Sequence, residues 1–136
     1  MLGRHRTHLK SARHLLAVLL WAMLCGSGVA LADAIAPASE APKGAPRRTF
    51  RISASKYHFT PDHITIHHGA IGVLVVNSED VTHGIHVIGT GESKDVVPGV
   101  PTVVLFYARE PGRGRFSCSH LCGLGHLFMS GTIIVE

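Results

Sequence analysis

The stretch Cys118–Met129, CSHLCGLGHLFM, places two thiols, imidazoles and a thioether within twelve residues. Cys118, Cys122, His126 and Met129 follow the spacing C-x3-C-x3-H-x2-M. Thiolate, thioether and imidazole donors suit copper better than they suit magnesium, calcium or manganese. One cysteine would describe a site for a single copper ion, whereas two cysteines allow two ions bridged by both sulfurs. We therefore interpret residues 118–129, the C-terminal loop, as a copper-binding loop.

A disulfide between Cys118 and Cys122 is the plainer alternative in an oxidising compartment. It would close a very small loop and stabilise the fold little. It also leaves the offsets of His126 and Met129 unexplained. We favour metal binding, although an empty site could oxidise and then need reduction before copper enters.

The composition allows one domain and argues against nucleic acid as a partner. The chain has 136 residues, of which 46% are hydrophobic, enough for a packed core. Four of its thirteen basic residues precede position 14, and all nine acidic residues lie at Asp33 or later. The remaining nine basic and nine acidic groups cancel, and aromatic residues are sparse, so neither a basic patch nor a stacking platform is expected.

Residues 1–32 have the pattern of an export signal. A basic segment, Arg4–Arg13, precedes the apolar run Leu15–Leu24, and Ala30–Ala32 fits an A-x-A cleavage site. The apolar run is shorter than the ~20 residues that usually span a membrane. We predict a cleaved signal peptide and a periplasmic, exported protein; the alternative is an uncleaved anchor in the inner membrane, facing the periplasm, with membrane contact.

Turn residues divide the rest of the chain into short segments. Residues 33–48 are rich in Ala, Pro, Ser and Gly and are predicted to form a flexible linker, so the folded domain is expected over 49–136. Short β-type patterns cover 50–54, 64–67, 72–77, 81–88, 102–107, 114–118 and 131–135. The connection 57–62 reads as irregular. Seven or so strands without a helical period predict an all-β, antiparallel β-sandwich.

The second imidazole of a copper site must come from outside the C-terminal loop, and His83 is the best candidate. It follows a polar bend and begins an apolar strand. Alternation along a strand puts His83, Ile85 and Val87 on one face and His86 on the other. We expect His86 near the rim of the site, held by a hydrogen bond or close to a redox partner.

The segments DVTHGIHV, residues 80–87, and CSHLCGLGHLFMSGTI, residues 118–133, resemble the binuclear copper (CuA) domain of cytochrome c oxidase subunit II. The single-helix subunit II of certain bacterial oxidases is the nearest comparison, and the CuA domain of nitrous oxide reductase shares the pattern. The resemblance covers residues 49–136 and implies a cupredoxin-like Greek-key β-sandwich.

The resemblance also implies six metal-site residues and two copper ions. Cys118 and Cys122 would bridge the two ions, and His83 and His126 would each bind one of them. The Met129 thioether and the His120 carbonyl would be weak ligands. Many oxidase subunits have an acid in place of His120 that reaches a magnesium ion, so a magnesium site is not carried over. The aromatic-rich segment for electron entry is also missing, since the only tryptophan is Trp21 in the leader.

Electron transfer is the function that the resemblance implies. A cytochrome c or another periplasmic redox protein would donate electrons, and a terminal oxidase or reductase would accept them, with oxidase subunit I as a further partner. The chain would not be catalytic alone, only the electron-entry subunit of an oxidase. The alternative is a periplasmic copper chaperone or sensor of cupredoxin fold, which the extra histidines favour slightly.

Two further groups of side chains carry expectations. Leu121, Leu124, Leu127 and Phe128 are expected either to keep water from the sulfurs or to pack in the core. Four more histidines are predicted to be ordinary surface residues, with a secondary copper-acquiring patch as the alternative: His58, His63, His67 and His68.

Overall fold

The computed structural model describes residues 33–136, which belong to one compact unit; the predicted leader, residues 1–32, lies outside the described residues. Two five-stranded sheets face each other in this part of the chain. The first contains, in spatial order, β1 (Ile35–Ala36), β8 (Thr102–Ala108), β5 (Ile71–Ser78), β2 (Arg47–Ser55) and β3 (His58–Thr60). The second contains β4 (His63–Ile66), β10 (Ser130–Val135), β9 (Gly112–Ser117), β6 (His83–Val87) and β7 (Ser93–Val96).

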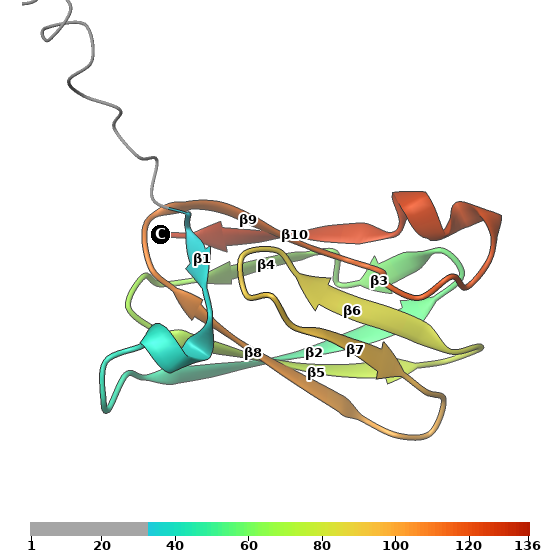
Figure 1. Ribbon diagram of the computed structural model, residues 1–136, viewed down its shortest axis with the longest axis horizontal. Helices are drawn as coiled ribbons and strands as arrows, with labels where there is room; N and C mark the ends of the chain where they lie inside the picture. The colour runs from blue at the N-terminus through green and yellow to red at the C-terminus, as the bar shows by residue number, and fades with distance from the viewer. Residues whose placement is uncertain (1–32) are drawn as a thin grey trace, which may run out of the picture. The chain divides into compact units, whose positions relative to one another are not determined.

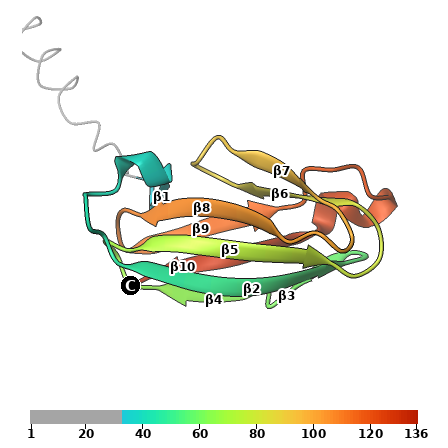
Figure 2. The same ribbon diagram turned by 90° about the horizontal axis from the view of Figure 1, so that it is seen from below.

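Two short 3₁₀ helices, η1 (Ala38–Glu40) and η2 (Leu124–Phe128), are the only helical elements over residues 33–136. No helix in this part of the chain is long and apolar enough to cross a membrane. The predicted all-β sandwich is confirmed. Figures 1 and 2 place β1 at one end of the sandwich and the loop containing η2 at the opposite end.

The apolar patterns produce the central strands as predicted. β5, the continuous apolar run, lies in the middle of its sheet between β8 and β2 (Figure 2). Ile64 and Ile66 are buried and Thr65 is exposed, as alternation requires. The two sheets meet through aromatic rings such as Phe59 of β3 and Phe116 of β9, whose centroids lie 5.2 Å apart in an edge-to-face arrangement.

The prediction of a purely antiparallel sandwich is wrong. β2 pairs with β5 in parallel, and β4 pairs with β10 in parallel. Between β2 and β5 the chain passes through β4 in the other sheet, and it therefore returns beside β2 in the same direction. β3 and β7 were also absent from the prediction, because each is a short edge strand with mostly exposed side chains.

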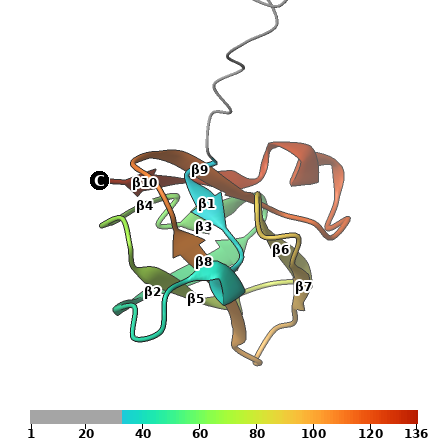
Figure 3. The same cartoon turned by 60° about the vertical axis from the view of Figure 1, so that its left-hand side comes forward.

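The prediction of a flexible linker over residues 33–48 is also wrong. Ile35 and Ala36 are 2% and 1% exposed and pair with β8, and Arg47 already begins β2. Figure 3 shows β1 running between β9 and β8. Ile35 of β1 occupies the space beside Gly114 of β9, where a Cβ would overlap its side chain. The N-terminal strap, residues 34–41, therefore joins one sheet to the other, and an ion pair between Glu40 and Arg109 holds its far end.

Candidate metal centre

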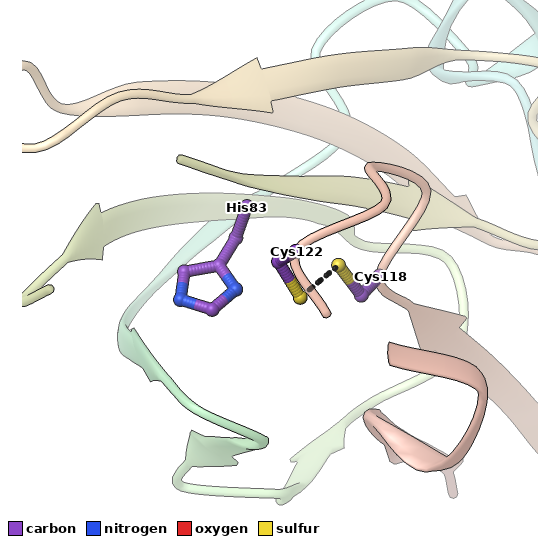
Figure 4. Close-up of side chains that lie close together, drawn as sticks. All are labelled: His83, Cys118 and Cys122. Atoms are coloured by element: carbon purple, nitrogen blue, oxygen red, sulfur yellow. Dashed lines mark hydrogen bonds between the residues drawn. The ribbon is translucent and has the colours of Figure 1, made fainter. Parts of the chain in front are cut away.

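The structure brings three of the predicted ligands together. His83, Cys118 and Cys122 each offer one donor atom, and these atoms all lie within 4.8 Å of one another (Figure 4). No other such group of three His, Cys, Asp or Glu side chains occurs over residues 33–136. The strand register explains the meeting, because β6 and β9 pair antiparallel through His86 and Ser117. The chain therefore continues from Ser117 into the loop alongside β6, where the Gly84 amide reaches Cys118.

The two cysteines are free thiols. Their sulfurs are 3.7 Å apart, far beyond the ~2.05 Å of a disulfide bond. Cys118 is 6% exposed. The pKa of the Cys122 thiol is raised by its own burial and by the neighbouring Cys118 thiol. The Gly84 amide donates to Cys118 Sγ at 3.4 Å, so a backbone dipole already points at the sulfur where negative charge would lie. The simple-disulfide alternative is not the state of this structure.

His83 is completely buried and has one ring nitrogen without a partner. Its Nε2 lies 2.7 Å from Asp80 Oδ1, whereas its Nδ1 has no hydrogen-bond partner. An ionised carboxylate only accepts hydrogen bonds, so Nε2 carries the proton and Nδ1 keeps its lone pair. A buried lone pair without a partner is unfavourable, and a metal ion bound to Nδ1 would satisfy it.

Asp80 fixes this tautomer. It also accepts hydrogen bonds from the Lys56 amide at 2.8 Å and the Val81 amide at 2.7 Å. Desolvation opposes ionisation of Asp80, but the hydrogen bonds from His83 and the two amides outweigh it and lower its pKa to about 2. Asp80 is therefore ionised at neutral pH. The sequence pattern included this residue without assigning it a role; its position three residues before His83 was the available signal.

His126 lies on η2 and offers a second unpartnered nitrogen. Its Nδ1 is buried and has no hydrogen-bond partner, like that of His83. Its backbone amide bonds to the Gly123 carbonyl at 3.1 Å. His126 does not belong to the group within 4.8 Å, which contains only His83 and the two cysteines. The structure thus brings His83 to the thiols and leaves His126 on the adjoining turn of the same loop.

Met129 and His120 lie at the edges of the group. Met129 is 1% exposed, and its carbonyl accepts from the Cys118 amide at 2.9 Å, which closes the two ends of the C-terminal loop. The His120 carbonyl lies 3.2 Å from Cys118 Sγ. The His120 side chain instead turns outward, with Nδ1 3.2 Å from Asp95 Oδ1 on β7. Only the backbone of His120 therefore faces the sulfurs.

Gly84 has a steric role that the sequence pattern did not reveal. A Cβ at this position would lie 2.5 Å from the His120 amide nitrogen and would overlap Ser119. The C-terminal loop rests directly on the β6 backbone at this point. The glycine of the HGIH segment is therefore required for the close approach that lets the Gly84 amide reach Cys118.

Both expectations for the four large apolar side chains of the C-terminal loop are wrong. Leu121, Leu124, Leu127 and Phe128 are 81%, 97%, 78% and 83% exposed. The strands already fill the core, and the inward positions of the loop hold Cys118 and Met129. The four side chains point outward instead. They form the apolar patch, part of which lines a groove of about 360 Å³ beside His126.

The remaining histidines behave as surface residues. Four of them are exposed: His58, His63, His67 and His68. His63 Nδ1 pairs with Asp62 at 2.8 Å, and His58 Nε2 lies 3.1 Å from Ser55 Oγ. His86 Nδ1 donates to the Glu92 carbonyl at 2.7 Å, which confirms the expected hydrogen bond.

Comparison with known proteins agrees with this fold. A family model described as a cupredoxin-like domain matches residues 14–135, and the chain therefore belongs to the cupredoxin-like domain family. A cytochrome c oxidase subunit 2 from Thermus thermophilus is 39% identical over 88 residues, 65% of this chain and 65% of that relative. The chain thus spans slightly less than two thirds of that relative's length.

Two further proteins extend the comparison. Nitrous-oxide reductase from Stutzerimonas stutzeri is 36% identical over 58 residues, which are 43% of this chain and 9% of the reductase. A chain of a heme-copper terminal oxidase dimer solved by cryo-EM superposes with a TM-score of 0.62 at 26% identity, covering 96% of this chain and 97% of that one. The predicted resemblance to oxidase subunit II is confirmed, and the chain is a cupredoxin-like domain similar to that subunit.

Proposed function

We propose that the protein transfers electrons through a binuclear, CuA-type copper centre. Cys118 and Cys122 would bridge two copper ions, and His83 and His126 would each bind one ion through Nδ1. The observation that carries the proposal is a pair of free thiols 3.7 Å apart, accompanied by two histidines whose buried Nδ1 atoms have no partner. The Met129 thioether and the His120 carbonyl would be the weak ligands.

When bound, the copper pair would share one electron between its two ions and so exchange electrons with little change in geometry. The residues of this chain limit that change further. Asp80 holds His83 in one tautomer, and the bond between the Cys118 amide and the Met129 carbonyl holds the ends of the loop together. The Gly84 amide would stabilise the negative charge of a Cys118 thiolate.

The apolar patch would be the surface on which the redox partner docks. Its three leucines line the groove beside His126, which is one of the proposed ligands. No Asp, Glu, Lys or Arg occurs over residues 116–135, so the patch itself carries no fixed charge. A cytochrome c-like donor with an apolar face around its haem would fit, and its association should depend weakly on salt. A terminal oxidase or reductase would accept the electrons.

The proposed function also implies an exported location for the protein. An exported domain, periplasmic or anchored and facing the periplasm, would meet a soluble donor and a membrane-bound oxidase together. The relatives named cytochrome c oxidase subunit 2 support an oxidase as the acceptor, and the export pattern over 1–32 supports the compartment.

Copper stoichiometry combined with electron paramagnetic resonance tests the proposal. The protein is reduced, loaded with copper and freed of excess metal. Two copper ions per chain that share one unpaired electron are expected. One copper ion per chain with the electron on a single nucleus would refute the binuclear centre, and copper that a weak chelator removes within seconds would favour a carrier.

A further inference from the structure

The turn between β2 and β3 contacts both segments that carry the candidate histidine ligands. The Lys56 amide donates to Asp80 Oδ2 at 2.8 Å, and Asp80 Oδ1 in turn holds His83. The next residue, Tyr57, lies against the C-terminal loop at Gly123 and Gly125. The turn is far away in sequence from the C-terminal loop. It nevertheless contacts Asp80, which holds His83, and also contacts the segment that leads to His126.

The contact between Tyr57 and the loop is close. A Cβ on Gly123 would lie 2.5 Å from Tyr57 Oη and 3.1 Å from Cε1, and a Cβ on Gly125 would overlap the Tyr57 ring. The aromatic side chain therefore lies directly on the backbone on both sides of Leu124. Gly123 also has a φ of 133°, a value that side-chain-bearing residues rarely adopt. Both positions accept the tyrosine because neither has a side chain.

The loop has few other anchors at this point. None of the residues of η2 is buried, and Leu124 is 97% exposed. The backbone bonds from His126 to Gly123 and from Met129 to His126 lie within the loop and do not attach it to the sandwich. Between Cys122 and Met129, Tyr57 supplies the packing contact that the apolar side chains of the loop do not make.

We propose that Tyr57 is a positioning residue that clamps the segment between Cys122 and His126 onto the sandwich. The proposal rests on the proposed function for the identity of the ligands, but the clamp itself is a property of the metal-free protein. Tyr57 is 40% exposed, so its ring packs on the loop with one side while the other side remains at the surface. Loss of the ring frees the turn that carries His126 while Asp80 still holds His83.

Amide hydrogen exchange on the metal-free, reduced protein tests the clamp. Tyr57→Ala should raise exchange over residues 122–128 by about tenfold or more, because opening of this segment no longer breaks a packed contact. Tyr57→Phe should keep wild-type exchange, since the ring makes the contact and Tyr57 Oη has no hydrogen-bond partner among the side-chain bonds of residues 33–136. Tyr107→Ala, which removes the other tyrosine from β8, is the matched control and should leave residues 122–128 unchanged.

A second variant approaches the same contact from the loop. Gly125→Ala should displace the ring and reproduce the raised exchange even if Tyr57→Ala fails to fold. In copper-loaded protein, Tyr57→Ala should also broaden the copper spectrum, and Tyr57→Phe should restore it. Unchanged exchange over 122–128 in both Tyr57→Ala and Gly125→Ala would overturn the clamp. Because exchange is measured without metal, failure of copper loading would refute the proposed function and leave this result standing.

Discussion

The N-terminal strap and the C-terminal loop lie at opposite ends of the sandwich and reverse what their compositions indicate (Figure 1). The strap contains four alanines, one serine, one proline, one glutamate and a single isoleucine, yet Ile35 is 2% exposed. The loop contains three leucines and a phenylalanine, yet Leu124 is 97% exposed. Local hydrophobicity predicts burial only where a space in the fold accepts the side chain. Gly114 leaves such a space for Ile35, whereas the inward positions of the loop already hold Cys118 and Met129.

The difference also separates stability from function. The strap closes the end of two sheets and has no chemistry of its own. The loop uses its inward positions for thiols and a thioether, and its apolar side chains remain at the surface. Changes at one end should therefore affect unfolding, and changes at the other should affect copper or partner binding.

The largest expected effect is at the loop. Cys122→Ser should abolish binding of two copper ions, because a hydroxyl cannot replace a bridging thiolate. The free energy of unfolding of the metal-free protein should change little, since Cys122 is only partly buried. Copper analysis and denaturant unfolding measure the two properties, with Ser119→Ala as a control on the same loop. Retention of two copper ions in Cys122→Ser would contradict the ligand assignment.

The strap should show the reverse behaviour. Ile35→Ala should lower the free energy of unfolding by about 2–5 kcal/mol, the usual range for truncation of a buried isoleucine. Copper content and spectrum should stay as in the wild type, because the site is at the other end. Ile88→Ala, at a position 49% exposed, is the control. If both variants lower the free energy of unfolding by the same amount, burial of Ile35 in the strap does not stabilise the fold more than an exposed side chain does.

Asp80 tests the support of the site while leaving every ligand in place. Asp80→Asn removes the charge that keeps the His83 Nε2 proton in position, and copper affinity should fall by about 10- to 100-fold. Competition with a chelator measures the affinity. Glu79→Gln is the control, because Glu79 bonds to Ser53 and does not contact His83. Equal affinities for both variants would show that Asp80 does not position the ligand.

The apolar patch should give the smallest change and leave the copper site intact. Leu124→Ser should slow electron transfer from reduced cytochrome c roughly tenfold, the effect of losing one buried leucine from an interface. The copper spectrum should not change. Val100→Ser, at a position 59% exposed and outside the patch, should transfer electrons at the wild-type rate. A wild-type rate for Leu124→Ser in stopped-flow mixing would place the docking surface elsewhere.

Much of the sandwich could be predicted because its strands carry strong local patterns. The continuous run of β5 indicated a central strand, and the alternation of β4 indicated which side chains are buried. The parallel pairs, β1 and β7 could not be predicted in this way. The direction of β5 beside β2 depends on the path of the chain through the other sheet. Three of the four residues of β7 are exposed, so this strand has no apolar pattern.

The candidate site divides in the same way. The spacing of Cys118, Cys122, His126 and Met129 is local, and His83 follows from the alternation of one strand. Gly84 contacts Cys118, 34 residues further along the chain, and Tyr57 contacts Gly123, which is still further away in sequence. Asp80 is only three residues from His83, but its carboxylate is also held by the Lys56 amide, 24 residues earlier. Such roles leave no periodic signal in one sequence.

The sequence by itself determined the all-β class and the soft donors, because donor chemistry and strand periodicity are properties of the residues and their order. Only the tertiary structure decided that Ile35 is buried and Leu124 is exposed. It also decided that His83 reaches the thiols with Nδ1 free, while the carboxylate of Asp80 holds its other nitrogen. Burial and hydrogen bonding depend on what lies beside a residue in space, and here those neighbours come from other strands.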